Sequence, residues 1–135
     1  MNKKLLLYAC ALVFFIWIVN TLANMFYWYS AMWWFDIPMH FMGGVFLALV
    51  AGALFFKKLI PLSSKESFVT ILLFVLIVGL GWEFFEYIVQ TLIKGAQLAN
   101  VPDSAKDMIM DLLGGSFASV FVLRRLKRYN KAHAK

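Results

Sequence analysis

The sequence contains few charged residues, and this scarcity excludes a soluble globular domain. Only 15% of the 135 residues are charged and 63% are hydrophobic, whereas soluble domains have about 25% charged and roughly 45–50% apolar residues. A membrane-spanning helix uses about 20 apolar residues, so the chain has room for four such helices and no second domain. The composition predicts a single all-α domain over residues 1–135, a polytopic membrane protein in a lipid bilayer.

Cysteine is almost absent, which removes two further classes. The single cysteine, Cys10, excludes a disulfide framework and a metal site built from cysteines. We expect it to be an inert thiol in the inner half of the first helix.

Four apolar segments are long enough to cross a membrane. They cover about residues 5–23, 37–56, 68–93 and 103–123. We expect the first to be a retained helix rather than a cleaved signal peptide, because its apolar run is long and no A-x-A cleavage site follows it.

The basic residues are distributed unevenly. A net charge of +6 would suggest nucleic acid as the partner of a soluble protein. However, eleven of the thirteen lysines and arginines precede the first segment, lie between the second and third, or follow the fourth, and only Lys94 and Lys106 lie in the other loops. This positive-inside pattern predicts both termini in the cytoplasm, with a basic tail near anionic lipid and no nucleic-acid partner.

The loop between the first two segments is rich in aromatic residues. Seven of its ten residues are aromatic: Phe26, Tyr27, Trp28, Tyr29, Trp33, Trp34 and Phe35. The simplest interpretation is an interfacial belt. The functional alternative is a lid over an outward-facing site, holding a lipid headgroup or a sugar by its ring faces.

Six of the seven acidic residues fall in the outer layer of the predicted bundle. With one histidine they form three sets: Asp36 and His40, Glu83 and Glu86, and Asp103, Asp107 and Asp111. At about 100° per residue, each set occupies one narrow face of its helix. A carboxylate at the bilayer centre costs at least roughly 2.5–3.5 kcal/mol, so these faces are expected to turn inward and converge.

Converging carboxylates raise one another's pKa and cannot all be ionised without compensation. Because no Lys or Arg is expected at their depth, the solutions are a divalent metal ion or a group of coupled protonatable acids. Oxygen ligands with one imidazole suit Mg, Mn or Ca, and carboxylates with histidine also hold Zn. The predicted ligands are His40, Glu83, Glu86 and Asp107, and Asp111 or Asp36 would serve as general base.

Structural roles compete with this interpretation at several positions. Asp36 and Asp103 lie near helix starts, where aspartate is a good N-cap, and for Asp103 capping is preferred to ligation. His40 alone would be a hydrogen-bonded core residue. Asn20 and Asn24 either close the fourth side of the site or lie at the interface.

Two segments match each other. Residues 36–44 carry the pattern D-x-x-x-H-x-x-G-G, and residues 107–115 carry D-x-x-x-D-x-x-G-G in the same direction. A duplicated helical hairpin would explain the match, and so would a chance recurrence of a helix-packing motif.

Three motifs together resemble a known family. D-x-x-x-H-F-x-x-G at 36–44, W-E-x-x-E at 82–86 and D-x-x-x-D-M at 103–108 resemble those of YjdF-like bacterial inner-membrane proteins. The D-x-x-x-H-F opening is also similar, more distantly, to that of VanZ-like proteins linked to glycopeptide resistance. The resemblance covers about residues 33–120 and implies a site at the acids in a bacterial plasma (inner) membrane protein, without an established reaction. Asp111 departs from the YjdF pattern, where a small apolar residue is expected.

The leading hypothesis is a metal-dependent membrane hydrolase or transferase that acts on a lipid or lipid-linked envelope precursor. The alternatives are a proton- or cation-coupled transport or sensing element and an accessory protein whose polar cluster specifies helix packing. The inner halves of all four segments are almost wholly apolar, which argues against a relay across the membrane.

Overall fold

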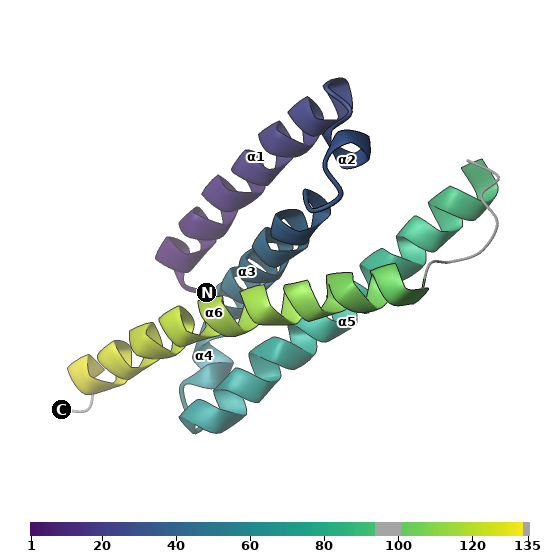
Figure 1. The fold of residues 1–135 in the computed structure, drawn as a ribbon. Coiled ribbons are helices and arrows are strands. Elements are labelled where there is room, and N and C mark those ends of the chain that lie inside the picture. Colours follow the sequence, from purple (N-terminus) through teal and green to yellow (C-terminus); the bar gives the residue numbers. More distant parts are fainter. Residues whose placement is uncertain (94–100, 134–135) are drawn as a thin grey trace.

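A computed structural model describes residues 1–93 and 101–133, and every regular element in this part of the chain is a helix (Figure 1). The elements are α1 (Lys3–Met25), α2 (Trp28–Ala31), α3 (Asp36–Leu54), α4 (Phe56–Leu59), α5 (Ser64–Ile93) and α6 (Val101–His133). The all-α prediction is therefore confirmed for the described residues, while Lys94 lies outside them.

Three of the helices are long and apolar enough to cross a membrane. These stretches are Lys3–Met25, Asp36–Leu54 and Ser64–Val89, and they contain most of the first three predicted segments. The fourth predicted segment lies within α6, a 33-residue helix that continues through the basic tail. Because of its charged residues, α6 is not among the helices that are apolar enough to cross a membrane. The fourth crossing therefore stays a prediction.

The four long helices form an open bundle with α3 and α6 crossing at its centre. In Figure 1, α1 lies along α3, and α6 crosses in front of α5, with which it is in contact. The most apolar window of α3 is 44% buried inside the protein, compared with 11% for α1 and 17% for α5. The two outer helices therefore present most of their apolar side chains outward, as helices do when lipid surrounds them.

The crossing of α3 and α6 depends on glycine. A Cβ on Gly44 would overlap the backbone carbonyl of Asp111, and one on Gly114 would overlap the carbonyl of Phe41. The two helix backbones touch here, as small residues allow in membrane helix pairs. The two segments with matching patterns thus face each other across one helix contact, which accounts for Gly44 and Gly114 by packing, while Gly115 packs against Val75 of α5.

The end of the bundle that contains the start of α1 is held by apolar packing and by the cap of that helix. Leu5, Ile71 and Val122 are fully or almost fully buried in the main core. The side-chain oxygen of Asn2 accepts a hydrogen bond from the Leu5 amide at 3.3 Å, and the Asn2 amide donates to the Ala53 carbonyl at 2.9 Å. The N-terminus of α1 is thereby fixed beside the C-terminus of α3.

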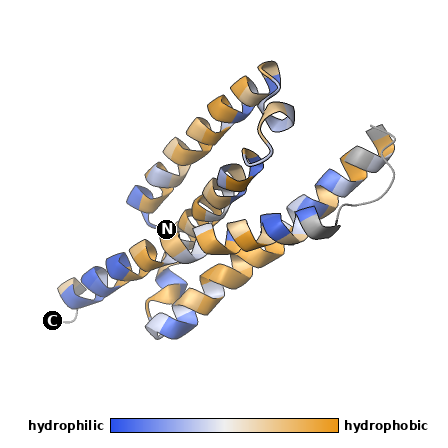
Figure 2. Ribbon diagram, viewed as in Figure 1, coloured by the Kyte–Doolittle hydropathy of each residue, from blue (hydrophilic) through white to orange (hydrophobic). Residues whose placement is uncertain are grey.

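Polar residues concentrate at the ends of the bundle. Figure 2 shows hydrophilic residues at the starts of α1 and α5 and along the last turns of α6, with mainly hydrophobic stretches between the two ends. Except for Glu66 in the first turn of α5, the acidic residues of α3, α5 and α6 lie toward the other end. The two kinds of charge are therefore separated along the bundle.

Candidate functional site

His40 lies among three carboxylates where α3 crosses α6. Its Nε2 atom is 3.5 Å from Asp36 Oδ1 and 3.8 Å from Asp107 Oδ2, and its Nδ1 atom is 3.7 Å from Asp111 Oδ1. His40, Asp107 and Asp111 are buried. The structure thus brings the predicted polar faces of these two helices together.

The third helix contributes two half-buried glutamates on another side of the same imidazole. Ligand atoms of His40, Glu83 and Glu86 lie within 4.8 Å of one another, and so do those of Asp36, His40 and Asp107. We call these five residues, together with Asp111, the acid cluster. All four predicted metal ligands belong to it, but they fall into two groups that share His40, and Asp36 joins one group as a potential ligand.

Asp111 occupies a notch that two glycines leave open. A Cβ on Gly43 of α3 would lie 3.4 Å from Asp111 Oδ1, and one on Gly79 of α5 would lie 3.1 Å from Oδ2. The carboxylate therefore lies against the backbone of both neighbouring helices and faces Nδ1 of His40. This position suits a group that fixes the orientation of the imidazole.

Two carboxylate oxygens of the cluster are buried without a hydrogen-bond partner among the described residues. They are Glu83 Oε1 and Asp107 Oδ1. Leaving a buried acceptor unpaired costs about 1–3 kcal/mol, and more for a charged group. The cluster therefore favours a bound proton or cation at these oxygens.

Lys106 reaches the edge of the cluster, which the sequence interpretation missed. Its Nζ atom forms a 2.6 Å ion pair with Asp103 Oδ1 and lies 3.6 Å from Asp107 Oδ1. The expectation that no cation approaches the acids is therefore wrong at this outer edge. Lys106 partly compensates Asp107, while Glu83 and Glu86 have no lysine or arginine within 4 Å among the described residues.

The interpretation of Asp36 as an N-cap is wrong. The cap of α3 is Phe35, which makes no capping side-chain hydrogen bond, and Asp36 is the first residue of the helix. Its carboxylate approaches His40 instead. Asp103 is the third residue of α6 and pairs with Lys106.

Tyr29 on α2 is a residue of the site that the sequence did not single out from the other aromatics. Its hydroxyl donates a 2.8 Å hydrogen bond to Asn20 Oδ1. Burial and the nearby charges of Asp36 and Glu86 together raise the pKa of Tyr29 to about 12. The phenol therefore lies within reach of the charges of the acid cluster, and Asn20 secures the loop to α1.

The aromatic loop is anchored by one ring and exposed at others. Phe35 is 7% exposed and makes edge-to-face contacts with Trp28 and Tyr29. Trp33 and Tyr27 are 82% and 75% exposed. The loop thus combines a packed group of rings around Phe35 with rings that project outward, as interfacial residues do.

Comparison with known proteins assigns the chain at the level of a family. A family model described as "Predicted membrane protein (DUF2238)" matches residues 4–128. The match spans the whole acid cluster and most of every long helix. No curated protein matches the chain, and no solved structure matches it.

Proposed function

The chain belongs to the DUF2238 family of membrane proteins, and we propose that its acid cluster binds a divalent metal ion, which is Mg, Mn, Ca or Zn. The observation that carries the proposal is the pair of buried oxygens that lack a hydrogen-bond donor among the described residues, Glu83 Oε1 and Asp107 Oδ1, in the two groups that share His40. Asp107 Oδ1 has only the ammonium group of Lys106, at 3.6 Å. Protons alone would satisfy the oxygens, but carboxylates that converge with an imidazole are the donor set that such metals take.

His40 is the central ligand of this proposal. Its Nε2 faces Asp36 and Asp107, and Glu83 and Glu86 complete the set from α5. Asp111 faces Nδ1 and orients the imidazole, as carboxylates commonly do for metal-bound histidines. Asp36 is the most exposed of the three aspartates that face His40, with 31% of its side chain accessible, and is the candidate general base.

We propose hydrolysis or group transfer on a lipid or lipid-linked envelope precursor as the reaction. A bound divalent ion activates water and orients a phosphate group. The chain itself supplies an aromatic loop beside the cluster: Tyr29 is near enough for the charges of Asp36 and Glu86 to act on it, and the exposed rings of Tyr27 and Trp33 offer flat surfaces to a headgroup or a sugar. Asp36 lies where a substrate entering beneath this loop would arrive.

The proposed topology has four crossings, with both termini in the cytoplasm of a bacterium and the acid cluster facing outward. Three exposed residues of α6, Ile109, Leu113 and Phe117, follow each other at intervals of four. They form an apolar stripe on one side of the helix, which supports a crossing for α6 despite the acids on its other side.

The finer family placement is part of the proposal. The three motifs that resemble those of YjdF-like proteins, and more distantly the VanZ-like opening, all lie within the matched residues. They supply the cluster's histidine and most of its acids.

Coupled transport is less well supported than a metal site. Below the cluster, the buried core of the described residues is apolar except for Ser67 and Ser119. Both hydroxyls donate to backbone carbonyls, those of Leu59 and Gly115. A continuous path for protons or ions toward the inner side would need further polar groups.

The test is metal analysis of the purified full chain in lipid nanodiscs. The wild type is expected to contain one of the four metals above background, to lose thermal stability on chelation and to regain it with that ion. The double substitution Glu83→Gln and Asp107→Asn should remove the metal and the ion-dependent stabilisation while the helix content is unchanged.

The matched control is Glu66→Gln, because Glu66 is an exposed carboxylate at the start of α5, where it accepts a 2.7 Å hydrogen bond from the Ser63 amide. This variant should keep the metal. A wild type without metal that gains no stability from any of the four ions would refute the proposal, and equal metal loss in the control would show that the cluster is not the site.

A further inference from the structure

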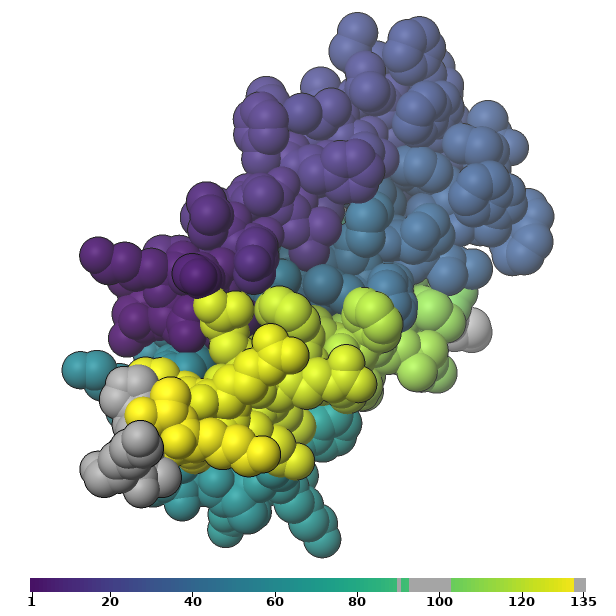
Figure 3. Space-filling view, turned by 90° about the vertical axis from the view of Figure 1, so that its left-hand side faces the viewer, coloured from purple at the N-terminus to yellow at the C-terminus, as the bar shows by residue number. Residues whose placement is uncertain are grey.

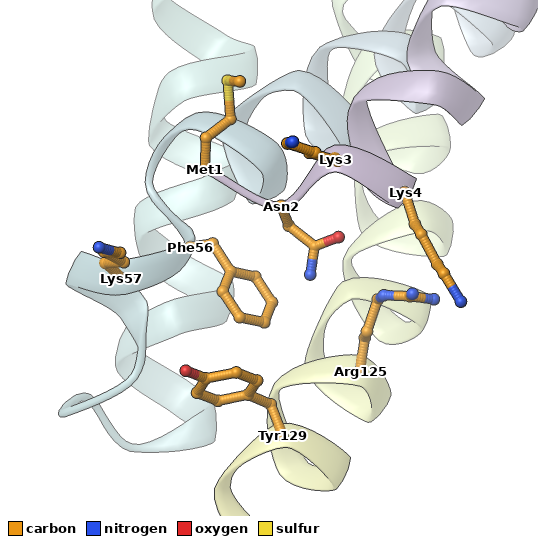
Figure 4. Close-up of a pocket in the computed structure, with 8 residues that line it drawn as sticks. All are labelled: Met1, Asn2, Lys3, Lys4, Phe56, Lys57, Arg125 and Tyr129. Atoms are coloured by element: carbon orange, nitrogen blue, oxygen red, sulfur yellow. The ribbon is translucent and has the colours of Figure 1, made fainter.

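The end of the bundle opposite the acid cluster contains two adjoining hollows of about 310 Å³ and about 570 Å³. They share five lining residues from the start of α1, from α4 and from the end of α6: Asn2, Lys4, Phe56, Arg125 and Tyr129. We call this joint feature the basic hollow. Figure 4 shows these five residues arranged around the first of the two spaces.

The basic hollow gathers positive charge without compensation. Six cationic side chains line it, namely Lys3, Lys4, Lys57, Arg124, Arg125 and Arg128. Among the described residues no carboxylate lines either space, and the ion pairs formed by lysines and arginines all involve Lys106. Six like charges from three chain segments repel one another, and an anion in their midst removes that repulsion.

The helix start adds hydrogen-bond donors in the same place. Asn2 Oδ1 caps α1 by accepting from the Leu5 amide, so its side-chain NH₂ group is left to donate elsewhere. The N-terminus of a 23-residue helix also carries partial positive charge. Phe56 and Tyr129 pack edge to face with ring centroids 5.4 Å apart and form an aromatic wall beside these donors.

The surface next to the basic hollow is apolar and exposed. Phe121 lines the second space and packs edge to face against Tyr8 of α1 at 5.9 Å, and both rings are 44% exposed. Figure 3 shows the first residues of α1 beside the C-terminal part of α6 on one face. Along α6 the surface therefore changes within about one turn from an exposed ring to arginines.

We infer that the basic hollow binds the phosphate group of an anionic phospholipid, with the acyl chains lying along Tyr8 and Phe121. The arginines suit bidentate contacts to phosphate oxygens, and Lys4 adds a point charge. Basic pockets between membrane helices on the cytoplasmic side are suited to phosphorylated headgroups. The inference concerns a site separate from the acid cluster, so it does not depend on a metal there.

The test measures lipid affinity of the full chain in detergent micelles by native mass spectrometry. Short-chain phosphatidylglycerol and phosphatidylcholine are compared as lipids, and inorganic phosphate and glycerophosphoglycerol as soluble anions. Wild type is expected to prefer phosphatidylglycerol over phosphatidylcholine and to bind the two soluble anions much more weakly. Lys4→Gln with Arg125→Gln should weaken phosphatidylglycerol binding by about 30-fold.

The matched control is Lys127→Gln with Lys131→Gln, which removes the same charge from α6 at positions that do not line the basic hollow. It should keep most of the affinity. Arg125→Lys, which retains the charge and guards against misfolding of the double variant, should bind better than Arg125→Gln.

Three outcomes would overturn the inference. Equal losses in the two double variants would indicate diffuse surface charge, and binding of soluble phosphate as tight as that of the lipid would indicate a free-anion site. Equal affinity for phosphatidylglycerol and phosphatidylcholine would show that the net negative charge of the headgroup is not recognised.

Discussion

At the scale of single residues, His40 is the centre of the acid cluster. Carboxylates face both of its nitrogens, with Asp111 at Nδ1 and Asp36 and Asp107 at Nε2. The notch between Gly43 and Gly79 gives Asp111 little freedom to move. An imidazole whose Nδ1 faces a fixed carboxylate keeps one orientation, and this lowers the entropy lost when an ion binds at Nε2.

The first residue-scale prediction separates ligands from orienting groups. Asp111→Asn should weaken divalent-ion affinity by about 10–100-fold, because a group that orients a ligating histidine contributes on that order, whereas His40→Ala should abolish binding. Calorimetric titration measures both. The control is Ser119→Ala, a buried change on the same helix, and an Asp111→Asn protein with wild-type affinity would contradict the assigned role.

The second residue-scale prediction concerns pH. The pKa of Tyr29 is raised from 10.0 to about 12 by burial and by Asp36 and Glu86, so its neutral form stabilises the folded state below about pH 10. That contribution is lost as the pH rises through about 12. The difference in phenolate absorbance between wild type and Tyr29→Phe should show this late transition.

Asp36→Asn should move the Tyr29 transition to lower pH, because it removes a negative charge that opposes ionisation. Asp103→Asn is the comparison, since Asp103 is not among the charges that act on the phenol. If the Tyr29 transition occurs at the same pH in wild type and in Asp36→Asn, the phenol does not lie near the acid cluster.

At the scale of elements, α3 and α6 meet backbone to backbone. The glycine pairs at 43–44 and 114–115 were predictable as sites of close helix approach, because small residues are what membrane helix contacts need. The sequence did not show which helices meet at these glycines, because α3, α5 and α6 all contain glycines and any two of them could pack closely. The same contact explains why the acid faces converge: the crossing sets the distance between Asp107 and His40.

The element-scale prediction uses three glycines. Gly44→Ala and Gly114→Ala each place a methyl group on a backbone carbonyl of the other helix, so each should destabilise the fold by about 1–3 kcal/mol or more and weaken metal binding as well. Gly81→Ala is the matched control, because a Cβ there meets nothing within 4 Å. Its effect should stay within about 1 kcal/mol, toward higher stability. Unfolding in mixed micelles with increasing sodium dodecyl sulfate measures all three, and equal effects would contradict the contact.

At the scale of the whole molecule, most cations lie at one end of the bundle, around the basic hollow, and most acidic residues lie at the other end, around His40. Much of this was predictable, because apolar length and 3.6-residue periodicity determine where helices lie and which face is polar. The positions of Lys106 and Tyr29 beside the acid cluster were not predictable. A flexible lysine reaches beyond its own helix turn, and nothing local distinguishes one ring of an aromatic loop from another. The helical form of the basic tail was also missed, because its charges obscured the continuation of α6 to His133.

The whole-molecule prediction tests the crossing of α6. In a Cys10→Ser background, Ala105→Cys should react with a membrane-impermeant maleimide in right-side-out spheroplasts, and Lys131→Cys should react only after lysis. Both positions are exposed, so accessibility within the protein does not bias the result. Labelling of both cysteines from the same side would show that α6 does not cross.

The position of His40 on α3 and of two of its acids on α6 also has a consequence for biogenesis. Helices enter a membrane in the order of synthesis, so His40 is inserted well before Asp107 and Asp111 can reach it. A chain that ends before α6 therefore lacks Asp107 and Asp111, and Glu83 and Glu86 then have His40 of α3 as the remaining polar partner. The acid cluster is complete only when the last helix has arrived.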